Sequence, residues 1–469
     1  LKNHPLDCPV CDYAGECKLQ DYYFDYGKFD SRLHDQKHPK HKAVDVGPSI
    51  VLDSERCVLC SRCVRFLSEI THTHELGIFG MGSHEEVNIH PGGYLDNDYA
   101  GNVVDLCPVG ALTNKDFRFK RRVWYIQSAS SICQLCSRGC NVRIDYDLNP
   151  FHQHKRSFQE NRYRTEATEH QRIQRIKPRK NISANGFYIC DHGRYGYRIT
   201  DSADRLLHPM VLDDGELKQV TLLEAVKEMV AGISLAVKKG QQKIAVIVSP
   251  KLTNEELFAV WVLFRDRLET ANMDHRLPID PQWYGDDLLR TPDPFPNRTG
   301  CEWIGIEPSE KGIGISGLSE AILKGKIDTL ISILADPREF LSSAALNKLK
   351  QRYLIVRNLP EELIPLTDIA LPAAAWGEYS GTFTNFRGRV QRLEAAFDPI
   401  GEALPVWKLM VALSAPLKKS LKWRSSDDVL DALGRKMMFF RGLTWDKIGS
   451  EGVDAPLEES QKKNSKAVG

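Results

Sequence analysis

The sequence predicts an α/β protein in which small, irregular, cysteine-rich segments precede an open parallel sheet. Eleven of the twelve cysteines lie between Cys8 and Cys190, and only Cys301 lies beyond them. From about residue 200 onward, short β-branched apolar runs alternate with helical patterns, which is the order that produces a parallel sheet covered by helices. A chain of 469 residues is expected to hold two to three domains.

The composition excludes several classes of partner. Lys and Arg number 63 and Asp and Glu number 62, so no overall field attracts nucleic acid or an anionic membrane. No apolar run approaches the length that crosses a bilayer, and we expect membrane contact only through other subunits. The chain begins with Leu1 rather than Met and already has a motif at His4, so we expect a fragment that lacks an N-terminal portion.

The most informative stretch is a run of three cysteines set two residues apart. Cys57, Cys60 and Cys63 are followed downstream by Cys107, which precedes Pro108. This spacing is typical of a ferredoxin-type [4Fe-4S] site. The four cysteines, called the Cys57 site below, are expected to bind one cluster together. The alternative is a structural zinc site, which usually takes its ligands from separated Cys-x2-Cys pairs.

A second set of donors opens the chain and is called the His4 site. It consists of His4, Cys8, Cys11 and Cys17, four metal-binding side chains within fourteen residues. An imidazole in place of a thiolate leaves an iron-sulfur site less negative and should raise its reduction potential. A zinc site with three thiolates and His4, or a surface histidine unrelated to the cysteines, are the alternatives.

A third set, the Cys133 site, is formed by Cys133, Cys136 and Cys140, with Cys190 as the fourth ligand. Between Cys140 and Cys190, the stretch 152–180 carries nine Lys or Arg and few apolar residues. We therefore predict an exposed, mobile insertion there. A solvated loop is favoured over a basic face for a partner.

Charged and aromatic side chains surround these cysteines. Arg56, Arg62 and Arg65 flank the Cys57 site, where they could neutralise its charge or contact surface carboxylates. An aromatic stretch at 22–29 is expected to pack over the His4 site and to keep water off it. The histidines between 34 and 41 are interpreted as part of a solvated loop.

In the second half of the chain, strands are predicted at 243–248, 327–333 and 353–356. A helix is predicted at 253–268, where Thr253 begins a capping pattern, and further helices lie around Ser319 and Ser342. No Gly-x-Gly-x-x-Gly or Walker-type loop is present. Cys301 stands alone and is interpreted as a core thiol.

With these cysteine sets, the chain resembles the large iron-sulfur subunit of respiratory complex I (NADH-quinone oxidoreductase) over nearly its whole length. The segment 4–20 looks like the cluster segment that this family ligates with one His and three Cys, and the Cys57 site looks like its next cluster. The Cys133 site is similar to the additional cluster of some bacterial members. The resemblance therefore implies two [4Fe-4S] clusters and a third.

The second half resembles the molybdopterin oxidoreductase fold. This resemblance rests on the runs 190–195 and 205–210 and on the signature 368–385 with 388–392. Active molybdenum relatives often carry Lys where this chain has His192, and Cys301 lacks the context of a metal ligand. Molybdenum is therefore not expected, and the domain is interpreted as a non-catalytic scaffold. The [2Fe-2S] domain that begins family members is not in this sequence, and that cluster is expected only in the missing N-terminal portion.

The predicted organisation has five parts. They are a His-ligated and Cys-ligated iron-sulfur segment at 1–45, a ferredoxin-like [4Fe-4S] segment at 46–125, a third iron-sulfur segment with the basic insertion at 126–200, a molybdopterin-oxidoreductase-like α/β domain at 201–457, and a disordered tail at 458–469.

The resemblance implies an electron-transfer subunit of an NADH:quinone oxidoreductase that relays single electrons towards quinone and has no catalytic residues of its own. The implied partners are the flavin-containing NADH-oxidising subunit and the quinone-side iron-sulfur subunits. The implied location is peripheral, on the cytoplasmic side of the bacterial inner membrane. The alternatives are the iron-sulfur and molybdopterin catalytic subunit of a formate dehydrogenase or a hydrogenase, and a zinc-stapled scaffold.

Overall fold

The computed structural model describes residues 3–28, 30, 33–148 and 172–455, which divide into two compact units. Unit 1 comprises Leu1–Ala129, Val142–Asp201 and Asp287–Leu289, and unit 2 comprises Ser130–Asn141, Ser202–Asp286 and Arg290–Gly469. The predicted tail at 458–469 and the first part of the basic insertion, 152–171, lie outside the described residues.

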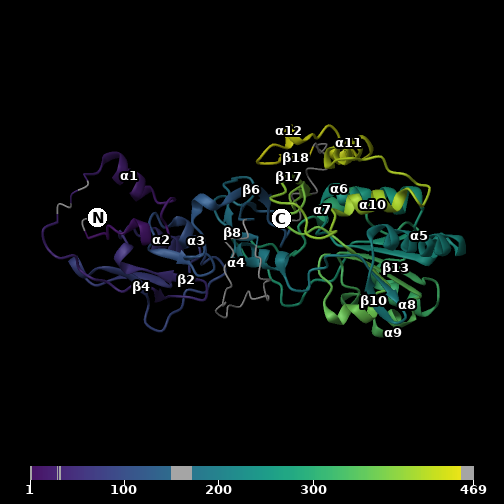
Figure 1. The fold of residues 1–469 in the computed structure, drawn as a ribbon, viewed down its shortest axis with the longest axis horizontal. Helices are drawn as coiled ribbons and strands as arrows, with labels where there is room; N and C mark the ends of the chain where they lie inside the picture. The colour runs from purple at the N-terminus through teal and green to yellow at the C-terminus, as the bar shows by residue number, and fades with distance from the viewer. Residues whose placement is uncertain (1–2, 29, 31–32, 149–171, 456–469) are drawn as a thin grey trace. The chain divides into compact units, whose positions relative to one another are not determined.

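Unit 1 is built from short strands and short helices (Figure 1). Its helices are α1 (Lys18–Tyr26), α2 (Arg62–Glu69), α3 (Asn102–Leu106) and α4 (Asp191–Tyr195). Its strands are β1 (Val44–Asp45), β2 (Ile50–Leu52), β3 (Leu76–Phe79), β4 (Glu86–Ile89), β5 (Leu112–Asn114) and β8 (Ile173–Pro178), while β6 (Gln127–Ile132) and β7 (Asn141–Tyr146) each cross the unit boundary. The sheet orders are β1-β2-β5, β3-β4 and β6-β7-β8.

The core of unit 1 brings cysteines and aliphatic side chains together. Leu52 of β2 and Leu67 of α2 are buried in one cluster with Cys63 and Cys107. Burial in this cluster removes the apolar side chains from water and gives the small unit most of its stability. Two thiols of the Cys57 site, those of Cys63 and Cys107, therefore lie in the core of the unit, where the surrounding backbone is held by packing.

One expectation about unit 1 is wrong. Residues 173–178, placed in the exposed insertion by their charge, form the strand β8, which pairs antiparallel with β7. Ile173 and Ile176 are 0% and 1% exposed, while Arg175 and Lys177 form ion pairs with Glu16. The positive charge of the strand is compensated by Glu16, which is far away in the sequence. The local composition of residues 173–178 does not reveal this partner.

Unit 2 contains a seven-stranded sheet with the order β10-β9-β15-β14-β13-β11-β12. The strands β12, β11, β13, β14 and β15 are parallel, and the hairpin of β9 and β10 is added antiparallel at one edge. The strand bounds are β9 Met210–Asp213, β10 Glu216–Gln219, β11 Ile244–Val248, β12 Asn272–Asp274, β13 Thr329–Ile333, β14 Gln351–Val356 and β15 Ile369–Pro372. The predicted open parallel sheet is confirmed, with this hairpin in addition.

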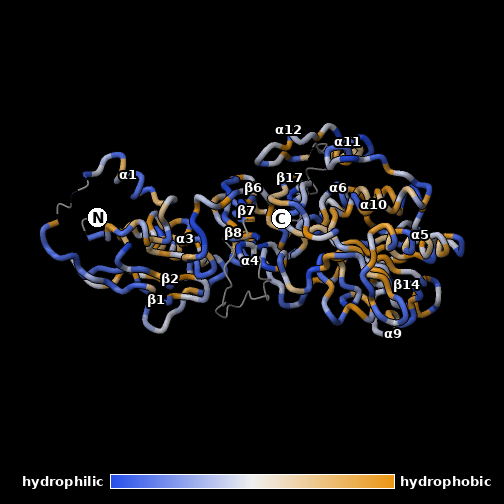
Figure 2. The backbone as a smooth tube through the Cα atoms, viewed as in Figure 1, coloured by the Kyte–Doolittle hydropathy of each residue, from blue (hydrophilic) through white to orange (hydrophobic). Residues whose placement is uncertain are grey.

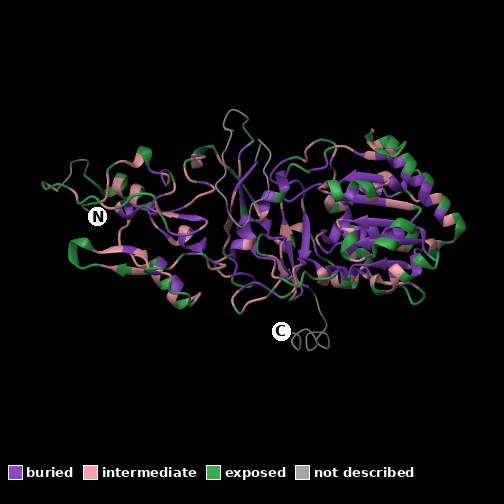
Figure 3. Cartoon of the chain, turned by 90° about the horizontal axis from the view of Figure 1, so that it is seen from below, coloured by how far each residue is buried: buried purple, intermediate pink, exposed green. Residues whose placement is uncertain are grey.

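Helices cover both faces of this sheet. Ile244, Val246 and Val248 of β11 pack in the cluster that contains the residues of α5, α6 and α10, whereas Ala245 and Ile247 pack with α8 and α9. This alternation is the period-2 pattern of a strand buried on both faces. The central strands of the sheet are largely apolar in Figure 2 and buried in Figure 3. The helices are α5 Leu222–Lys239, α6 Asn254–Val260, α7 Arg298–Ile304, α8 Ile315–Leu323, α9 Ser343–Lys348, α10 Val406–Ser414, α11 Ser426–Lys436 and α12 Trp445–Ile448.

The predicted helix at 253–268 is present, with a change of pitch. Thr253 caps α6 through a capping box with Glu256, as its sequence indicates. After Val260 the chain continues as a π-helix over Trp261–Arg267. A smaller sheet of β16 (Gly381–Thr384), β17 (Arg389–Leu393) and β18 (Val453–Asp454) completes the unit. Within the described part of the chain, no helix is both long and apolar enough to cross a membrane.

Candidate iron-sulfur sites

The His4 site is assembled by a compact N-terminal loop. A 3-10 turn at Cys8–Val10 is closed by a hydrogen bond from Cys11 N to Cys8 O of 3.0 Å, and Cys17 precedes α1 as its N-cap residue. His4, Cys8, Cys11 and Cys17 all line one cavity. The structure therefore brings together all four donors that the sequence predicts for this site.

The donors of this cavity, all within the described residues, are of the types that bind iron-sulfur clusters, although no three of them converge closely enough to hold a single metal ion. The Nδ1 atom of His4 is buried without a hydrogen-bond partner, so a ligand is needed to satisfy it. Burial and the nearby charge of Arg56 lower the pKa of His4, which favours the neutral imidazole that binds metals. Burial raises the pKa of the Cys11 and Cys17 thiols, so a bound metal must supply the charge that stabilises their thiolates.

The aromatic residues beside this cavity differ from the expectation. Tyr22, Phe24 and Tyr26 line the cavity on α1, but their exposed fractions are 59%, 62% and 83%. In this chain they therefore border the His4 site without sealing it from water. Phe29, which belongs to the same stretch, lies outside the described residues.

The Cys57 site is assembled around a tight turn. Leu59 and Ser61 have φ angles of 53° and 59°, which reverse the chain between Cys57 and Cys63, and α2 begins directly after Ser61. Cys107 is the C-cap residue of α3 and is followed by Pro108, which cannot continue a helix. Cys57, Cys60, Cys63 and Cys107 line a second cavity. All four predicted donors are again together.

This second cavity is apolar apart from the thiols. Its other lining residues are aliphatic side chains, Pro108 and Ser61, and no charged side chain is among them. Burial and the neighbouring cysteines raise the pKa of Cys63 to about 12, and burial raises the pKa of Cys107 to about 11. The Cys63 and Cys107 thiols therefore need a nearby positively charged centre to lose their protons.

The two sites share a wall. The Cys17 thiol donates to the carbonyl oxygen of Pro108 with an Sγ to O distance of 3.6 Å, and Pro108 directly follows Cys107. Gly110 lies against the other side of the His4 site, because a Cβ atom there would be 2.5 Å from Cys11 Sγ. The backbone from Cys107 to Gly110 therefore lies between the donors of one site and those of the other.

The donors of the Cys133 site are divided between the units. Cys133, Cys136 and Cys140 belong to unit 2, where Cys133 N bonds to Cys140 O at 2.8 Å and closes their loop. Cys190 belongs to unit 1, where it caps α4 by accepting from Gly193 N at 3.4 Å. All four thiols are buried. Their use as one ligand set stays a prediction.

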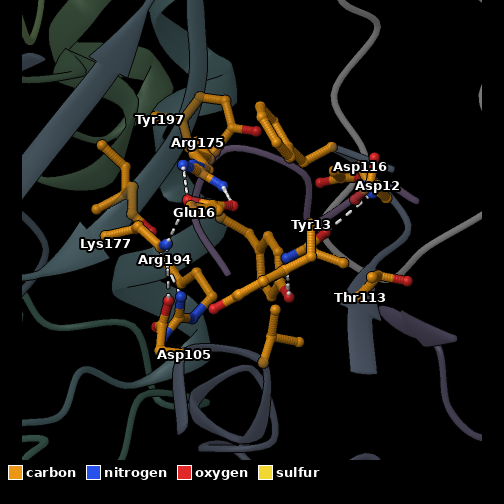
Figure 4. A pocket seen from close by; sticks show the side chains of 15 residues that line it. Asp12, Tyr13, Glu16, Asp105, Thr113, Asp116, Arg175, Lys177, Arg194 and Tyr197 are labelled. Atoms are coloured by element: carbon orange, nitrogen blue, oxygen red, sulfur yellow. Dashed lines mark hydrogen bonds and ion pairs between the residues drawn. The ribbon is translucent and has the colours of Figure 1, made fainter. Parts of the chain in front are cut away.

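A charged network in unit 1 was not predicted from the sequence (Figure 4). Arg175 of β8 donates through both Nη atoms to the Glu16 carboxylate at 2.8 Å and through Nε to Asp145 at 2.7 Å. Lys177 lies 3.3 Å from Glu16 and 3.8 Å from Asp105. The network ties the residue before Cys17 to the helix that ends at Cys107, and no motif marks it because its members are far apart in sequence.

No three His, Cys, Asp or Glu side chains in the described residues converge closely enough to hold a single metal ion.

The three arginines that flank the Cys57 run lie in different surroundings. Arg62 and Arg65 are exposed on α2, whereas Arg56 is buried and lines the cavity of the His4 site. Cys301 is 0% exposed in α7 and its pKa is raised by burial, as expected for a core thiol.

Comparisons with known proteins agree with the resemblance. Residues 1–32 match the NADH-ubiquinone oxidoreductase-G iron-sulfur binding region, and residues 47–113 match the ferredoxin-like domain of NADH-quinone oxidoreductase subunit 3. Residues 310–416 match the molybdopterin oxidoreductase family. These matches confirm the predicted fold class, in which iron-sulfur segments precede a molybdopterin-oxidoreductase-like α/β domain.

Curated relatives point in the same direction. The G subunit of NADH-quinone oxidoreductase from Streptomyces coelicolor is 34% identical over 60% of this chain and 30% of its own length. The protein of the same name from Rickettsia typhi is 36% identical over 56% of this chain and 35% of its own length. The chain is similar to the G subunit of NADH-quinone oxidoreductase. It spans about a third of the length of these relatives.

A solved structure covers more of the chain at lower identity. Acetylene hydratase from Pelobacter acetylenicus aligns over 71% of this chain and 75% of its own, with 9% identity and a TM-score of 0.44.

Proposed function

We propose that the chain is an electron-transfer subunit of a respiratory NADH:quinone oxidoreductase. The His4 site and the Cys57 site would each hold one [4Fe-4S] cluster, and the Cys133 site a third. An iron-sulfur cluster supplies one-electron oxidation and reduction. The part of this chain is to hold the ligands in place, keep the two sites close together and set the charge around each of them.

The observation that carries this proposal is the wall shared by the two sites. Cys17 of one site lies 3.6 Å from the carbonyl oxygen of Pro108, which is bonded to Cys107 of the other. Because electron tunnelling weakens steeply with distance, two redox centres on either side of one short backbone segment exchange electrons readily. Two zinc sites would gain nothing from this proximity.

The remaining parts of the assignment follow the family resemblance of the sequence. The electrons would come from a flavin-containing NADH-oxidising subunit and would leave towards quinone-side iron-sulfur subunits. The chain would lie at the cytoplasmic side of the bacterial inner membrane through those subunits. The α/β domain would act as a scaffold without molybdenum. We also keep the five-part division at 1–45, 46–125, 126–200, 201–457 and 458–469 as a proposal.

Metal and sulfide analysis of the anaerobically purified chain tests this proposal. We expect iron and acid-labile sulfide in equal amounts, with at least two reducible centres in electron paramagnetic resonance spectra. Zinc without sulfide would identify a zinc-stapled scaffold instead. Near-stoichiometric molybdenum would identify the catalytic subunit of a molybdenum enzyme such as a formate dehydrogenase. Ligand variants Cys8→Ser and Cys60→Ser should each remove a different signal.

A further inference from the structure

Arg56 belongs to one site by sequence and to the other by structure. It ends the 3-10 turn Ser54–Arg56, directly before Cys57. Its side chain nevertheless lines the cavity of the His4 site and is not among the residues that line the cavity of the Cys57 site. With 7% of its surface exposed, it is a buried cation beside four metal-binding donors.

Three bonds fix the orientation of this guanidinium. Its Nη1 and Nη2 atoms donate to the two oxygens of Asp7 at 2.7 and 2.8 Å, and its Nε atom donates to Asp53 at 3.0 Å. The Cδ atom lies 3.6 Å from the Cβ position of Gly110 in the shared wall. A bidentate pair of this kind holds the charge in one place. Although burial disfavours the charged form, the bonds to Asp7 raise the pKa of Arg56.

The charge acts mainly on the His4 site. The Arg56 side chain lines the same cavity as His4, Cys8, Cys11 and Cys17, so its charge lies beside all four donors of that site. Arg62 and Arg65, the other arginines near the cysteine run, are exposed on α2, where water screens their charges. Because Arg56 is buried, its charge interacts with a neighbouring site more strongly than a charge on the surface does.

We propose that Arg56, carried by the loop of the Cys57 site, sets the reduction potential of the His4 site, with Asp7 as its counter-charge. The inference rests on the proposed electron-transfer function. Reduction adds one negative charge to a site, so a nearby guanidinium stabilises the reduced state and raises the potential. The carboxylate of Asp7 acts in the opposite direction. Arg56 is a positioning residue that acts through charge, without binding the metal.

The test changes the charge in both directions on the full chain, purified anaerobically with its clusters. Arg56→Gln removes the cation and leaves Asp7 unpaired, so the potential of the His4 site should fall. Asp7→Asn removes the anion, so that potential should rise. The double variant R56Q/D7N restores the net charge of the group and should return the potential close to that of the unchanged chain. Redox titration followed by electron paramagnetic resonance measures each value.

Each single variant should change the ratio of oxidised to reduced His4 site at a fixed potential by about tenfold, which equals about 59 mV for a one-electron couple. The Cys57 site should shift less, because no charged side chain lines its cavity. Arg65→Gln, which removes an exposed arginine of α2, is the matched control and should shift neither site.

Three outcomes separate the alternatives. Shifts of the same sign in R56Q and D7N, or equal shifts at both sites, would mean that these side chains act on packing and would overturn the inference. If R56Q does not retain a cluster in the His4 site, D7N alone decides, because its potential must rise. If the unchanged chain binds no iron-sulfur cluster at all, the proposed function fails before this inference is tested.

Discussion

Gly110 and Cys11 are packed so closely that a methyl group at residue 110 has no room. A Cβ atom there would lie 2.5 Å from the Cys11 Sγ atom and 3.1 Å from Tyr13 Cβ. Gly110 does not have a positive φ angle, so its requirement is steric and does not come from backbone conformation. The chain segment that follows Cys107 thus determines where a donor of the other site can lie.

Gly110→Ala should therefore displace Cys11 and weaken binding of the cluster in the His4 site. The fraction of chains that retain this cluster during purification should fall by about tenfold. The Cys57 site should be retained, since none of its own donors meets the added methyl group. Iron content and the spectra of the two sites measure the effect. Gly317→Ala on α8 is the control, because its Cβ meets only the Ile313 side chain at 3.3 Å. Equal loss from both sites would contradict the steric explanation.

His4→Cys tests the ligand role of the histidine. A thiolate adds negative charge to the site, so a cluster should still form but with a reduction potential that is lower by about 59 mV or more, equivalent to at least tenfold in its oxidised to reduced ratio. A redox titration measures this value. His34→Cys, at an exposed histidine of the loop, is the control and should leave the potential unchanged. An unchanged potential in His4→Cys would show that His4 is not a ligand.

The shared cavity of Cys57, Cys60 and Cys63 could be predicted because the signal is local. Cys57, Cys60 and Cys63 are close in sequence, and a short turn with two left-handed residues suffices to bring their thiols to one cavity. The buried strands of unit 2 were predictable for a related reason. A strand such as β11, which is buried at every position, has a continuous apolar and mostly β-branched sequence.

The burial of charged residues could not be predicted in the same way. Arg175 and Lys177 indicate a solvated segment when read alone. In the structure both are half-buried in β8, where the carboxylates of Glu16, Asp145 and Asp105 pair with them. Arg56 is a similar case, because Asp7, which pairs with both of its Nη atoms, lies 49 residues earlier in the chain. Pairings of this kind depend on the folded chain and leave no periodic pattern in the sequence.

Arg175→Met tests how much the network in Figure 4 contributes to the free energy of unfolding of unit 1. The substitution takes away one of the cations that pair with Asp145, whose side chain is 0% exposed. Removing one member of a buried ion pair typically costs about 3 to 5 kcal/mol. Protection of the Cys63 thiol against labelling in increasing urea, measured in the metal-free chain, reports this loss for unit 1.

The control for that experiment is Lys115→Met, in the same unit. Lys115 pairs with Asp45 at a solvent-exposed contact, where the Asp45 side chain is 62% exposed. An exposed pair contributes at most about 1 kcal/mol. If both variants lower the stability of unit 1 equally, the network of Arg175 contributes no more than an exposed ion pair, and the stabilising role proposed for it is wrong.

Glu255 makes the stability of unit 2 dependent on pH. The residue is 0% exposed on α6, where its carboxyl group accepts bonds from Thr382 N at 2.8 Å and Thr382 Oγ1 at 2.9 Å. Burial raises the pKa of Glu255 from 4.5 to about 7. Because the folded state favours the protonated form, its stabilising contribution is fully present below pH 4.5 and is lost as the pH rises through 7.

Unit 2 should therefore be more stable at pH 5 than at pH 8 by about 2 to 3 kcal/mol from this group. Glu255→Gln stays neutral at both values and should remove that difference, while its amide can still accept from the Thr382 backbone. Urea unfolding, monitored by labelling of the buried Cys301 thiol, measures the stability of unit 2 at each pH. Glu216→Gln, exposed on β10, should leave the pH dependence in place. A pH dependence that persists in Glu255→Gln would assign it to other buried groups.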